Sequence, residues 1–432
     1  MTLIVVGVSH RSAPFELLDL LALNDDGVRA LLDAVIVSDH VAEAMVVSTC
    51  NRVEIYADVD RFHGAVEDLG AAVAKRAGLP VDALAGHLYV HYDERAVHHV
   101  FSVAAGLDSM VVGEQQILGQ VRQALRTGQE FGSVGRTLNE LGQSALRVGK
   151  RVHTDTEIDR HGASVVSVAL DRAAGELGGI GGRRAAVIGA GAMASLAVAH
   201  LHAAGAGEIA VVNRTAAAAQ RLSEEFAIRG ANVRAIPVDE LDTALAEADL
   251  VVACTGATDA VIGPAHIAPR RSPRVLVDLA LPHDIDPAVR AVDGVVLIDL
   301  AALATDAPRH GESEAQAAAM VEQETRAFIA AQAAASVEPL VVSLRSRADG
   351  ICEREVSRLR LRLPALDDAS AAEVERAMRR AMSTLLHTPT VRMKELAADA
   401  DGERFAEAVR ALFDLDPATV HAITDAPEAW DA

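Results

Sequence analysis

Short apolar runs separated by helix-forming segments characterise the first part of the chain. The runs at residues 3–8, 44–49 and 53–59 have the length and alternation of strands, and helices are expected between them. From residue 94 to residue 153, apolar positions recur at spacings of three and four, the repeat of an amphipathic helix. Residues 154–164 are polar, which suits a crossing between domains. Residues 1–158 are therefore predicted to form an α+β domain.

Short strands alternate with helices in the next segment. An apolar run at residues 185–188 leads into a glycine-rich turn and then a helix to about residue 202. Further strands are expected at residues 208–212, 233–236, 249–254, 274–279 and 295–298. This alternation predicts a parallel, doubly wound, Rossmann-like sheet over residues 159–311.

Helix formers dominate the remaining chain. Residues 312–338 contain hardly a breaker, and Pro339 is expected to be the first interruption. A helix this long and polar is expected to be a spine or a dimer element and not part of a compact core. Residues 312–425 are predicted to be an all-α region; the last 30 or so residues are acidic and expected to be loosely ordered, with 426–432 as the tail.

Composition narrows the classes of protein. The 432 residues suffice for two or three domains, and three Cys provide no disulfide framework, which is typical of a reducing, cytoplasmic protein. The first residues lack the features of a signal peptide. No apolar stretch is expected to reach the ~18 uncharged residues that a membrane helix needs, so no membrane span is predicted.

Charge gives a more local signal. A formal charge of −21 argues against a general nucleic-acid binder, whose surface should be basic. Residues 345–394 nevertheless contain 11 Lys or Arg against 7 Asp or Glu. This excess either guides a polyanion or is simply the solvated face of a helix.

Cys50 is the first candidate for chemistry. It follows the apolar run 44–47 and lies in the segment Ser48-Thr49-Cys50-Asn51-Arg52-Val53-Glu54-Ile55-Tyr56. A thiolate is nucleophilic, and nearby positive charge favours it. Arg52 could supply that charge or bind a carboxylate. The alternative is a buried structural cysteine.

The glycine-rich turn after residue 188 predicts a dinucleotide site. Gly189-x-Gly191-x-x-Ala194 lies between a strand and a helix; the glycines permit a tight turn and close approach of a pyrophosphate. The next strand ends in Asn213-Arg214-Thr215 and not in an acidic residue, which favours NADP over NAD because Arg214 suits a 2′-phosphate. Alternatively, Arg214 is merely exposed. The predicted cofactor-binding residues are Gly189, Ala190, Gly191, Ala192, Met193, Ala194, Asn213, Arg214 and Thr215.

Three further segments give a specific resemblance. They are residues 7–14 (Gly-Val-Ser-His-Arg-Ser-Ala-Pro), residues 106–121 and residues 385–390 (Leu-Leu-His-Thr-Pro-Thr). Together with the Cys50 segment and the glycine turn, they resemble the glutamyl-tRNA reductase family over residues 3–397. The resemblance implies an N-terminal catalytic domain, an NADPH domain and a helical dimerisation domain on a spinal helix. It also implies reduction of glutamyl-tRNA by NADPH to glutamate-1-semialdehyde, the first step towards tetrapyrroles, through a thioester on Cys50.

The resemblance also implies residue roles. Cys50 and His99 are the catalytic residues, whereas His98 should point elsewhere on the helix. Arg52 suits the γ-carboxylate of glutamate, and we infer that Glu114 pairs with its α-ammonium group. The substrate-binding residues are Thr49, Asn51, Arg52, Ser109, Glu114, Gln115, Gln116 and Gln120. A homodimer and transfer of product to glutamate-1-semialdehyde aminomutase are expected, and no metal is.

Some features fit less closely. Cys254 and Cys352 are interpreted as packing residues. The family often has Pro-Arg in a segment where this chain has Pro282-His283, which leaves a charge role there in doubt at neutral pH. Two alternatives remain: an NADP-dependent dehydrogenase resembling shikimate dehydrogenase, which explains only residues 185–300, and a non-catalytic helical dimer that binds tRNA or a partner protein.

Overall fold

The computed structural model describes residues 2–49, 51–114, 116–156, 158, 164–257, 259–270, 272–304, 311–396, 402–413 and 415. The chain forms two compact units, Met1–Glu322 and Gln323–Ala432. The first unit contains two sheets and the second is helical.

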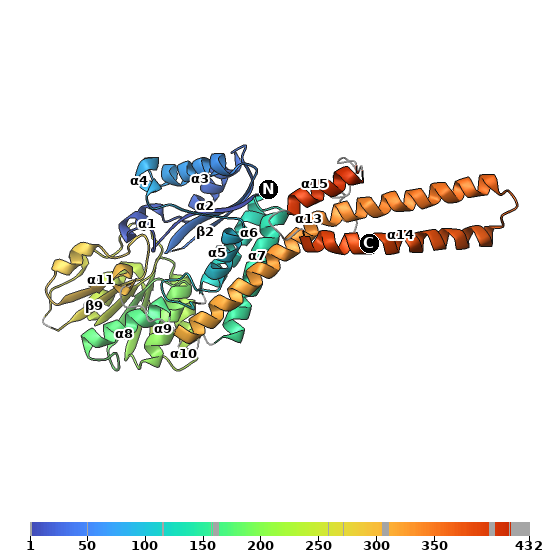
Figure 1. Cartoon of the computed structure of the whole chain (residues 1–432). Helices are drawn as coiled ribbons and strands as arrows, with labels where there is room; N and C mark the ends of the chain where they lie inside the picture. The colour runs from blue at the N-terminus through green and yellow to red at the C-terminus, as the bar shows by residue number, and fades with distance from the viewer. Residues whose placement is uncertain are drawn as a thin grey trace. The chain divides into compact units, whose positions relative to one another are not determined.

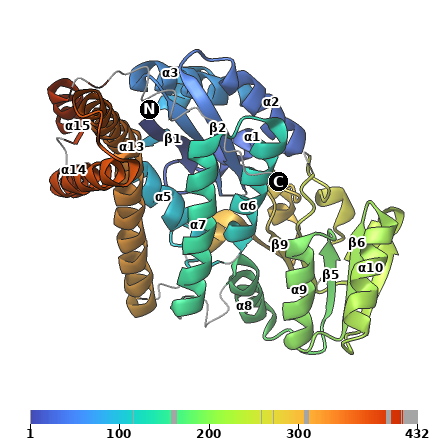
Figure 2. The same ribbon diagram turned by 90° about the vertical axis from the view of Figure 1, so that its right-hand side faces the viewer.

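An antiparallel sheet organises the first part of the chain. Among the described residues, its strands are β1 (Thr2–Ser9), β2 (Val41–Ser48), β3 (Arg52–Val59) and β4 (Tyr89–Tyr92), in the order β2-β3-β1-β4. The three predicted strands are confirmed, and β4 was not predicted. One face packs on α1 (Phe15–Leu21), α2 (Asp25–Ile36), α3 (Phe62–Arg76) and α4 (Val81–Ala85). The other packs on α5 (Glu94–Ala104), α6 (Gln116–Phe131) and α7 (Arg136–Asp155) (Figures 1 and 2).

Strand β3 is buried along its whole length. Because successive side chains of a strand point to opposite faces, Val53 and Ile55 enter the core beneath α1–α4. Arg52 and Glu54 therefore point to the face covered by α5–α7. A buried, charged stripe is thus built into the middle of the domain, and it demands internal partners.

A parallel sheet forms the second part of this unit. Within the described residues its strands are β5 (Arg184–Ile188), β6 (Glu208–Asn213), β7 (Val233–Pro237), β8 (Leu250–Ala253), β9 (Arg274–Asp278) and β10 (Val295–Ile298), in the order β10-β9-β8-β5-β6-β7. One face packs on α8 (Val165–Leu177), α9 (Ala192–Ala203), α10 (Ala216–Ala227) and α12 (Leu300–Ala304). The other packs on α11 (Leu241–Glu247), which follows η1 (Val238–Glu240), on η3 (Pro287–Ala291), and on Ile262 and Ile267, which flank η2 (Pro264–His266). The predicted doubly wound sheet is confirmed.

The second unit contains α14 (Asp368–Leu396), α15 (Gly402–Leu412) and most of α13 (Gly311–Arg362). The prediction that Pro339 interrupts this helix was wrong: α13 runs through it. Proline removes one helical hydrogen bond, but its neighbours Val337, Leu340 and Val341 are buried in one cluster with Leu386 of α14. Burial of these side chains offsets the lost bond. Predicted tail residues 426–432 lie outside the described residues.

Helix α13 also corrects the prediction about membrane spans. One 18-residue window of it has a mean hydropathy of 1.6 and is 28% buried, so among the described helices it is long and apolar enough to cross a membrane by length and composition. The prediction failed because Glu338 is the one charged residue between Arg326 and Arg345. A single helix of this kind is weak evidence for a span, since helices of soluble proteins pass the same test.

Candidate functional site

The predicted nucleophile belongs to the connection between β2 and β3. Cys50 itself lies outside the described residues, and hydrogen bonds hold its neighbours in place. The Thr49 N–H donates to the Arg52 carbonyl at 2.9 Å, and the Asn51 N–H donates to Thr49 Oγ1 at 3.1 Å. The His10 N–H donates to the Asn51 carbonyl at 2.9 Å. The tip of the β2–β3 hairpin is therefore held against the end of β1.

Arg52 is fully paired inside the protein. Its side chain is 1% exposed; Nη1 donates to Glu54 Oε1 at 2.7 Å, and Nη2 lies 2.9 Å from Asp108 Oδ2 and also donates to the Asp108 carbonyl. Burial opposes the charge of Arg52, but these two carboxylates raise its pKa above the ordinary value. Asp108 is shared with Arg11, whose Nη1 is 2.9 Å away. A substrate carboxylate at Arg52 would thus have to share a guanidinium that already has two acidic partners.

Glu54 is the centre of the buried stripe. Its Oε1 accepts hydrogen bonds from Arg52, from the Tyr89 hydroxyl and from His99 Nε2, the last at 2.8 Å. Its Oε2 accepts from the Tyr56 hydroxyl. Burial alone would raise the pKa of Glu54, but Arg52 and His99 hold it well below its usual range. Glu54 is therefore an ionised carboxylate with four internal donors.

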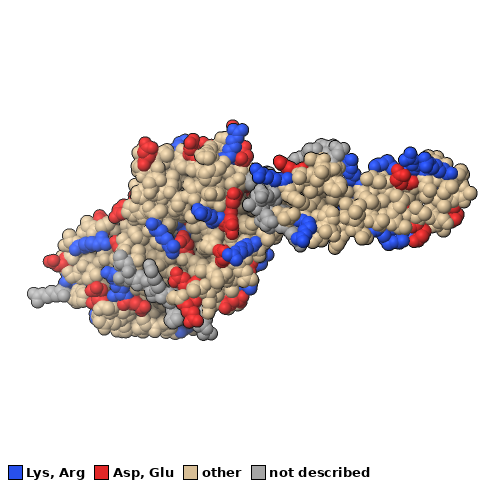
Figure 3. Space-filling model, in the orientation of Figure 1, with Lys and Arg blue, Asp and Glu red and all other residues tan. Residues whose placement is uncertain are grey.

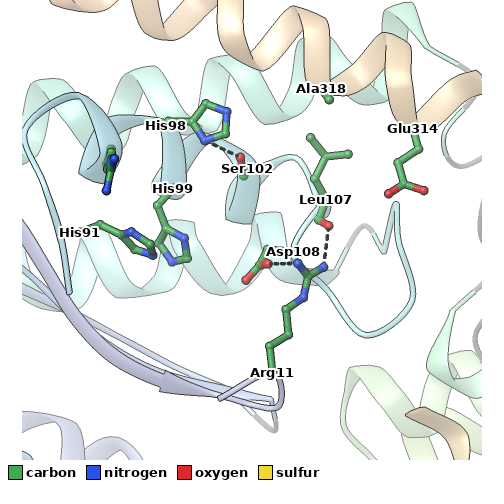
Figure 4. Close-up of a pocket in the computed structure, with 10 residues that line it drawn as sticks. Arg11, His91, His98, His99, Ser102, Leu107, Asp108, Glu314 and Ala318 are labelled. Atoms are coloured by element: carbon green, nitrogen blue, oxygen red, sulfur yellow. Dashed lines mark hydrogen bonds and ion pairs between the residues drawn. The ribbon is translucent and has the colours of Figure 1, made fainter. Parts of the chain in front are cut away.

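A hollow of about 490 Å³ opens beside this cluster (Figure 4). It is lined by Arg11, His91, Arg95, His98, His99, Ser102, Leu107, Asp108, Glu314 and Ala318. The expectation that His98 points away was wrong, because adjacent residues on α5 both reach this hollow. Their partners differ: His98 Nδ1 lies 3.4 Å from Ser102 Oγ, whereas His99 bonds to Glu54.

The segment after α5 folds back on itself. Gly106 and Gly113 adopt φ values of +74° and +84°, which favour glycine, and the Gly113 N–H donates to the Gly106 carbonyl at 3.0 Å. A side chain at Gly113 would meet the Ile158 carbonyl oxygen at 2.6 Å. This turn buries Ser109 and Glu114 near the start of α6.

Glu114 is buried without a charged partner. Among the described residues its carboxylate has no hydrogen bond or ion pair, and burial raises its pKa to about 7. Gln115 lies outside the described residues. Gln116 and Gln120 are partly exposed on the first turns of α6, four residues apart and so on one face.

The glycine turn between β5 and α9 has the geometry of a phosphate cradle. Gly189 has a φ of +126°, and a Cβ there would lie 2.6 Å from the Cys254 carbonyl oxygen. Gly191 is the N-cap of α9 and has open space around it. The third small residue, Ala194, is fully buried where the helix packs on the sheet. Because Gly191 has no side chain, the free N–H groups at the start of α9 are open to a phosphate.

Arg214 lies at the carboxyl end of β6, beside a cavity of about 670 Å³. Ile188, Asn213 and Thr255 line the same cavity, which therefore spans the ends of β5, β6 and β8, where the strand order reverses. Arg214 is exposed and forms no ion pair within the described part of the chain. Its guanidinium is available for a phosphate, as predicted for NADP.

Three side chains could hold a metal ion by geometry alone. Ligand atoms of Glu54, His99 and Asp108 lie within 4.8 Å of one another. Arg52 already donates to both carboxylates. A metal ion there would compete with the buried Arg52 for both carboxylates, so we interpret Arg52 as the cation that these carboxylates bind.

Other residues singled out in the sequence have structural surroundings. Cys254 packs against the core of the parallel sheet, and burial raises its pKa to about 12, which makes it a poor nucleophile. Cys352 is fully buried in α13. His283 Nδ1 lies 3.4 Å from Asp278, and this hydrogen bond is the main reason its pKa is raised; Asp19 is 3.2 Å from Nε2. His283 is thus protonated more readily than an ordinary histidine, which favours a charge at this position.

Comparison with known proteins covers nearly the whole chain. The family model for the glutamyl-tRNA(Glu) reductase N-terminal domain matches residues 6–156, and that for the dimerisation domain matches residues 316–415. The glutamyl-tRNA reductase 1 of Nocardioides sp. (strain ATCC BAA-499 / JS614) is 49% identical, covering 98% of this chain and 99% of the relative. This chain belongs to the glutamyl-tRNA reductase family.

Two solved structures that the chain resembles superpose on it only loosely. Glutamyl-tRNA reductase from Methanopyrus kandleri has 26% identity and a TM-score of 0.43, covering 96% of this chain and 99% of its own. Shikimate dehydrogenase from Mycobacterium tuberculosis has 27% identity and a TM-score of 0.24, covering 35% of this chain and 62% of its own. The shikimate/quinate 5-dehydrogenase family model matches residues 171–305. The alternative resembling shikimate dehydrogenase thus accounts for one domain of a glutamyl-tRNA reductase.

The family's cofactor, NADPH, fits the residues present. The open space at Gly191, the N-cap of α9, and the exposed Arg214 suit a pyrophosphate and a 2′-phosphate. Sequence reasoning missed the internal partners, namely Glu54, Tyr56, Tyr89, Asp108 and Arg11. One signal was available: Arg52, Glu54 and Tyr56 alternate with apolar residues on a strand, but that pattern is usually read as a solvent-facing edge.

Proposed function

We propose that this protein reduces glutamyl-tRNA to glutamate-1-semialdehyde with NADPH, through a thioester on Cys50. The observation that carries the proposal is the 49% identity to a glutamyl-tRNA reductase over 98% of the chain. The sulfur of Cys50 attacks the ester carbon, the bond to the tRNA 3′ oxygen breaks, and the glutamyl group remains on sulfur. When bound, NADPH supplies the hydride that converts the thioester to an aldehyde and returns the thiolate.

We assign domains to these steps in the order predicted from sequence. Residues 1–158 capture the glutamyl group, residues 159–311 bind NADPH, and residues 312–425 form the spine and dimerisation region. The hairpin tip that contains Cys50 and the cavity beside Arg214 belong to the first two of these.

Glutamate recognition rests on charges around the hairpin tip. Thr49, Asn51 and Arg52 would orient the γ-carboxylate, with Arg11 as a second cation across Asp108. The unpaired Glu114 suits the α-ammonium group, because a buried carboxylate is stabilised by an incoming cation. Ser109, Gln115, Gln116 and Gln120 complete the substrate segment.

The tRNA end would enter by the hollow beside His99. Arg95 lines it and forms no ion pair among the described residues. The basic excess of residues 345–394 is less available, because Arg376, Arg379 and Arg380 pair with carboxylates of the same unit. Figure 3 shows Lys and Arg interspersed with Asp and Glu on one face of α13 and α14.

The dimerisation domain implies a partner copy for the second unit. Leu361, Leu363 and Leu385 are 83%, 51% and 66% exposed in a single chain. A second copy would cover these side chains and the apolar window of α13. We further propose a cytoplasmic enzyme that passes its reactive α-amino aldehyde directly to the aminomutase; isotope dilution in a coupled assay tests this transfer.

The test compares two cysteines. Cys50→Ser should abolish tRNA-dependent NADPH oxidation and labelling of the protein by radioactive glutamate, while NADPH binding remains, because a hydroxyl is a far weaker nucleophile. Cys352→Ala, which removes a fully buried thiol of α13, is the matched control and should keep both activities. Substantial turnover by Cys50→Ser would contradict the thioester route.

A further inference from the structure

The strongest unexplained feature is the convergence of three donors on one oxygen of Glu54. Arg52, Tyr89 and His99 all donate to Oε1, while Oε2 receives the Tyr56 hydroxyl alone. The charge of Arg52 does not explain why three donors meet on this oxygen, because Arg52 also pairs with Asp108 at 2.9 Å. The contact with His99 therefore needs a separate explanation.

The charge of Glu54 decides which nitrogen of His99 bears the proton. An ionised carboxylate accepts hydrogen bonds and cannot donate them. The nitrogen facing it, Nε2, must then carry a hydrogen, so in the neutral imidazole the lone pair lies on Nδ1. Because His99 lines the hollow, Nδ1 is the atom left to exchange a proton with a group bound there.

Two neighbouring rings fix the orientation of this imidazole. His91 stacks on His99 with centroids 4.5 Å apart and an interplanar angle of 29° (Figure 4). Tyr89 approaches the ring edge-on at 5.5 Å. His99 is 11% exposed. The ring is thus held at one end by Glu54 and on its faces by its neighbours.

We propose that Glu54 is a positioning residue that fixes the tautomer of His99 and stabilises its protonated form during thioester formation. The inference rests on the function proposed above. Nδ1 takes the proton of the Cys50 thiol as sulfur bonds to the ester carbon; the same proton then goes to the departing tRNA 3′ oxygen. Between these transfers His99 is an imidazolium, and Glu54 balances its charge.

The test is the rate of thioester formation in a single turnover without NADPH, measured as release of tRNA. Glu54→Gln keeps the shape but removes the charge, and should slow this step by about 10²–10⁴-fold with the KM for glutamyl-tRNA little changed. Tyr56→Phe removes a donor from the other oxygen of the same carboxylate and should cost less than about tenfold. If Glu54→Gln does not fold, Glu54→Asp replaces it, because the shorter side chain keeps the charge near Arg52 but withdraws it from His99. Glu54→Asp should slow thioester formation by the same factor.

A double-mutant cycle separates positioning from packing. Glu54→Gln combined with His99→Ala should be no slower than His99→Ala alone, because the two residues act as a unit. If the rate losses of Glu54→Gln and His99→Ala multiply in the double variant, Glu54 only supports the core. Equal rate losses for Glu54→Gln and Tyr56→Phe would show the same. A wild-type rate for His99→Ala would overturn this inference and leave the proposed function intact, whereas substantial labelling of Cys50→Ser by radioactive glutamate would overturn the function itself.

Discussion

Glu114→Gln tests whether the glutamate site contains a carboxylate destabilised in the absence of substrate. Burial raises the pKa of Glu114 from 4.5 to about 7. A carboxyl whose pKa is higher in the folded than in the unfolded protein binds its proton more tightly in the folded state. The folded protein therefore loses stability as the pH rises from about 4.5 to about 7 and this carboxyl ionises. The cost to the folded protein is about 1 kcal/mol at pH 5 and about 3 kcal/mol at pH 8.

A glutamine side chain at this position has the same shape as glutamate and does not ionise. The variant should therefore be more stable than the wild type by an amount that grows by about 2 kcal/mol between pH 5 and pH 8. Urea unfolding of the free enzyme, followed by far-ultraviolet circular dichroism at both pH values, measures this difference. The variant should also have a higher KM for glutamyl-tRNA, since it lacks the charge that we propose to pair with the α-ammonium group.

Glu130→Gln is the matched control. Glu130 is 54% exposed and pairs with Arg126 on the surface of α6, so its loss should change stability by less than about 0.5 kcal/mol at either pH. A stability difference for Glu114→Gln that does not vary with pH, or a destabilised variant at pH 8, would refute the reasoning. Either result would mean that the Glu114 carboxylate has an internal partner.

Two further predictions concern the cofactor and the dimer. Arg214→Ala should weaken NADPH binding by about 1.5–3 kcal/mol and NADH binding much less, because only NADPH carries the 2′-phosphate; fluorescence titration with both cofactors decides, and equal losses would exclude phosphate recognition. Leu385→Arg should shift the protein to monomers in analytical ultracentrifugation, because it places a charge on an apolar helix surface that is 66% exposed in one chain. Ile228→Arg, at a residue 88% exposed on the NADPH domain, is its control and should remain dimeric.

Local sequence determined the parts of this protein whose chemistry is local. Gly189 and Gly191 need only a strand, a turn and a helix in succession, so the cofactor turn could be predicted from spacing. The position of Arg214 directly after β6 was predictable in the same way, and it is the position that contacts the ribose in dinucleotide-binding folds. The strands were recognisable because apolar alternation decides which face is buried.

Tertiary structure decided how the charges around Arg52 and Glu54 are arranged. The partners of Arg52 come from positions 54 and 108, and those of Glu54 from positions 56, 89 and 99; no spacing along the chain brings these together. Pro339 likewise remained within α13 because contacts with α14, distant in sequence, outweigh a local preference. Buried charges must find partners wherever the fold supplies them, so their pairing follows from packing and not from the linear pattern.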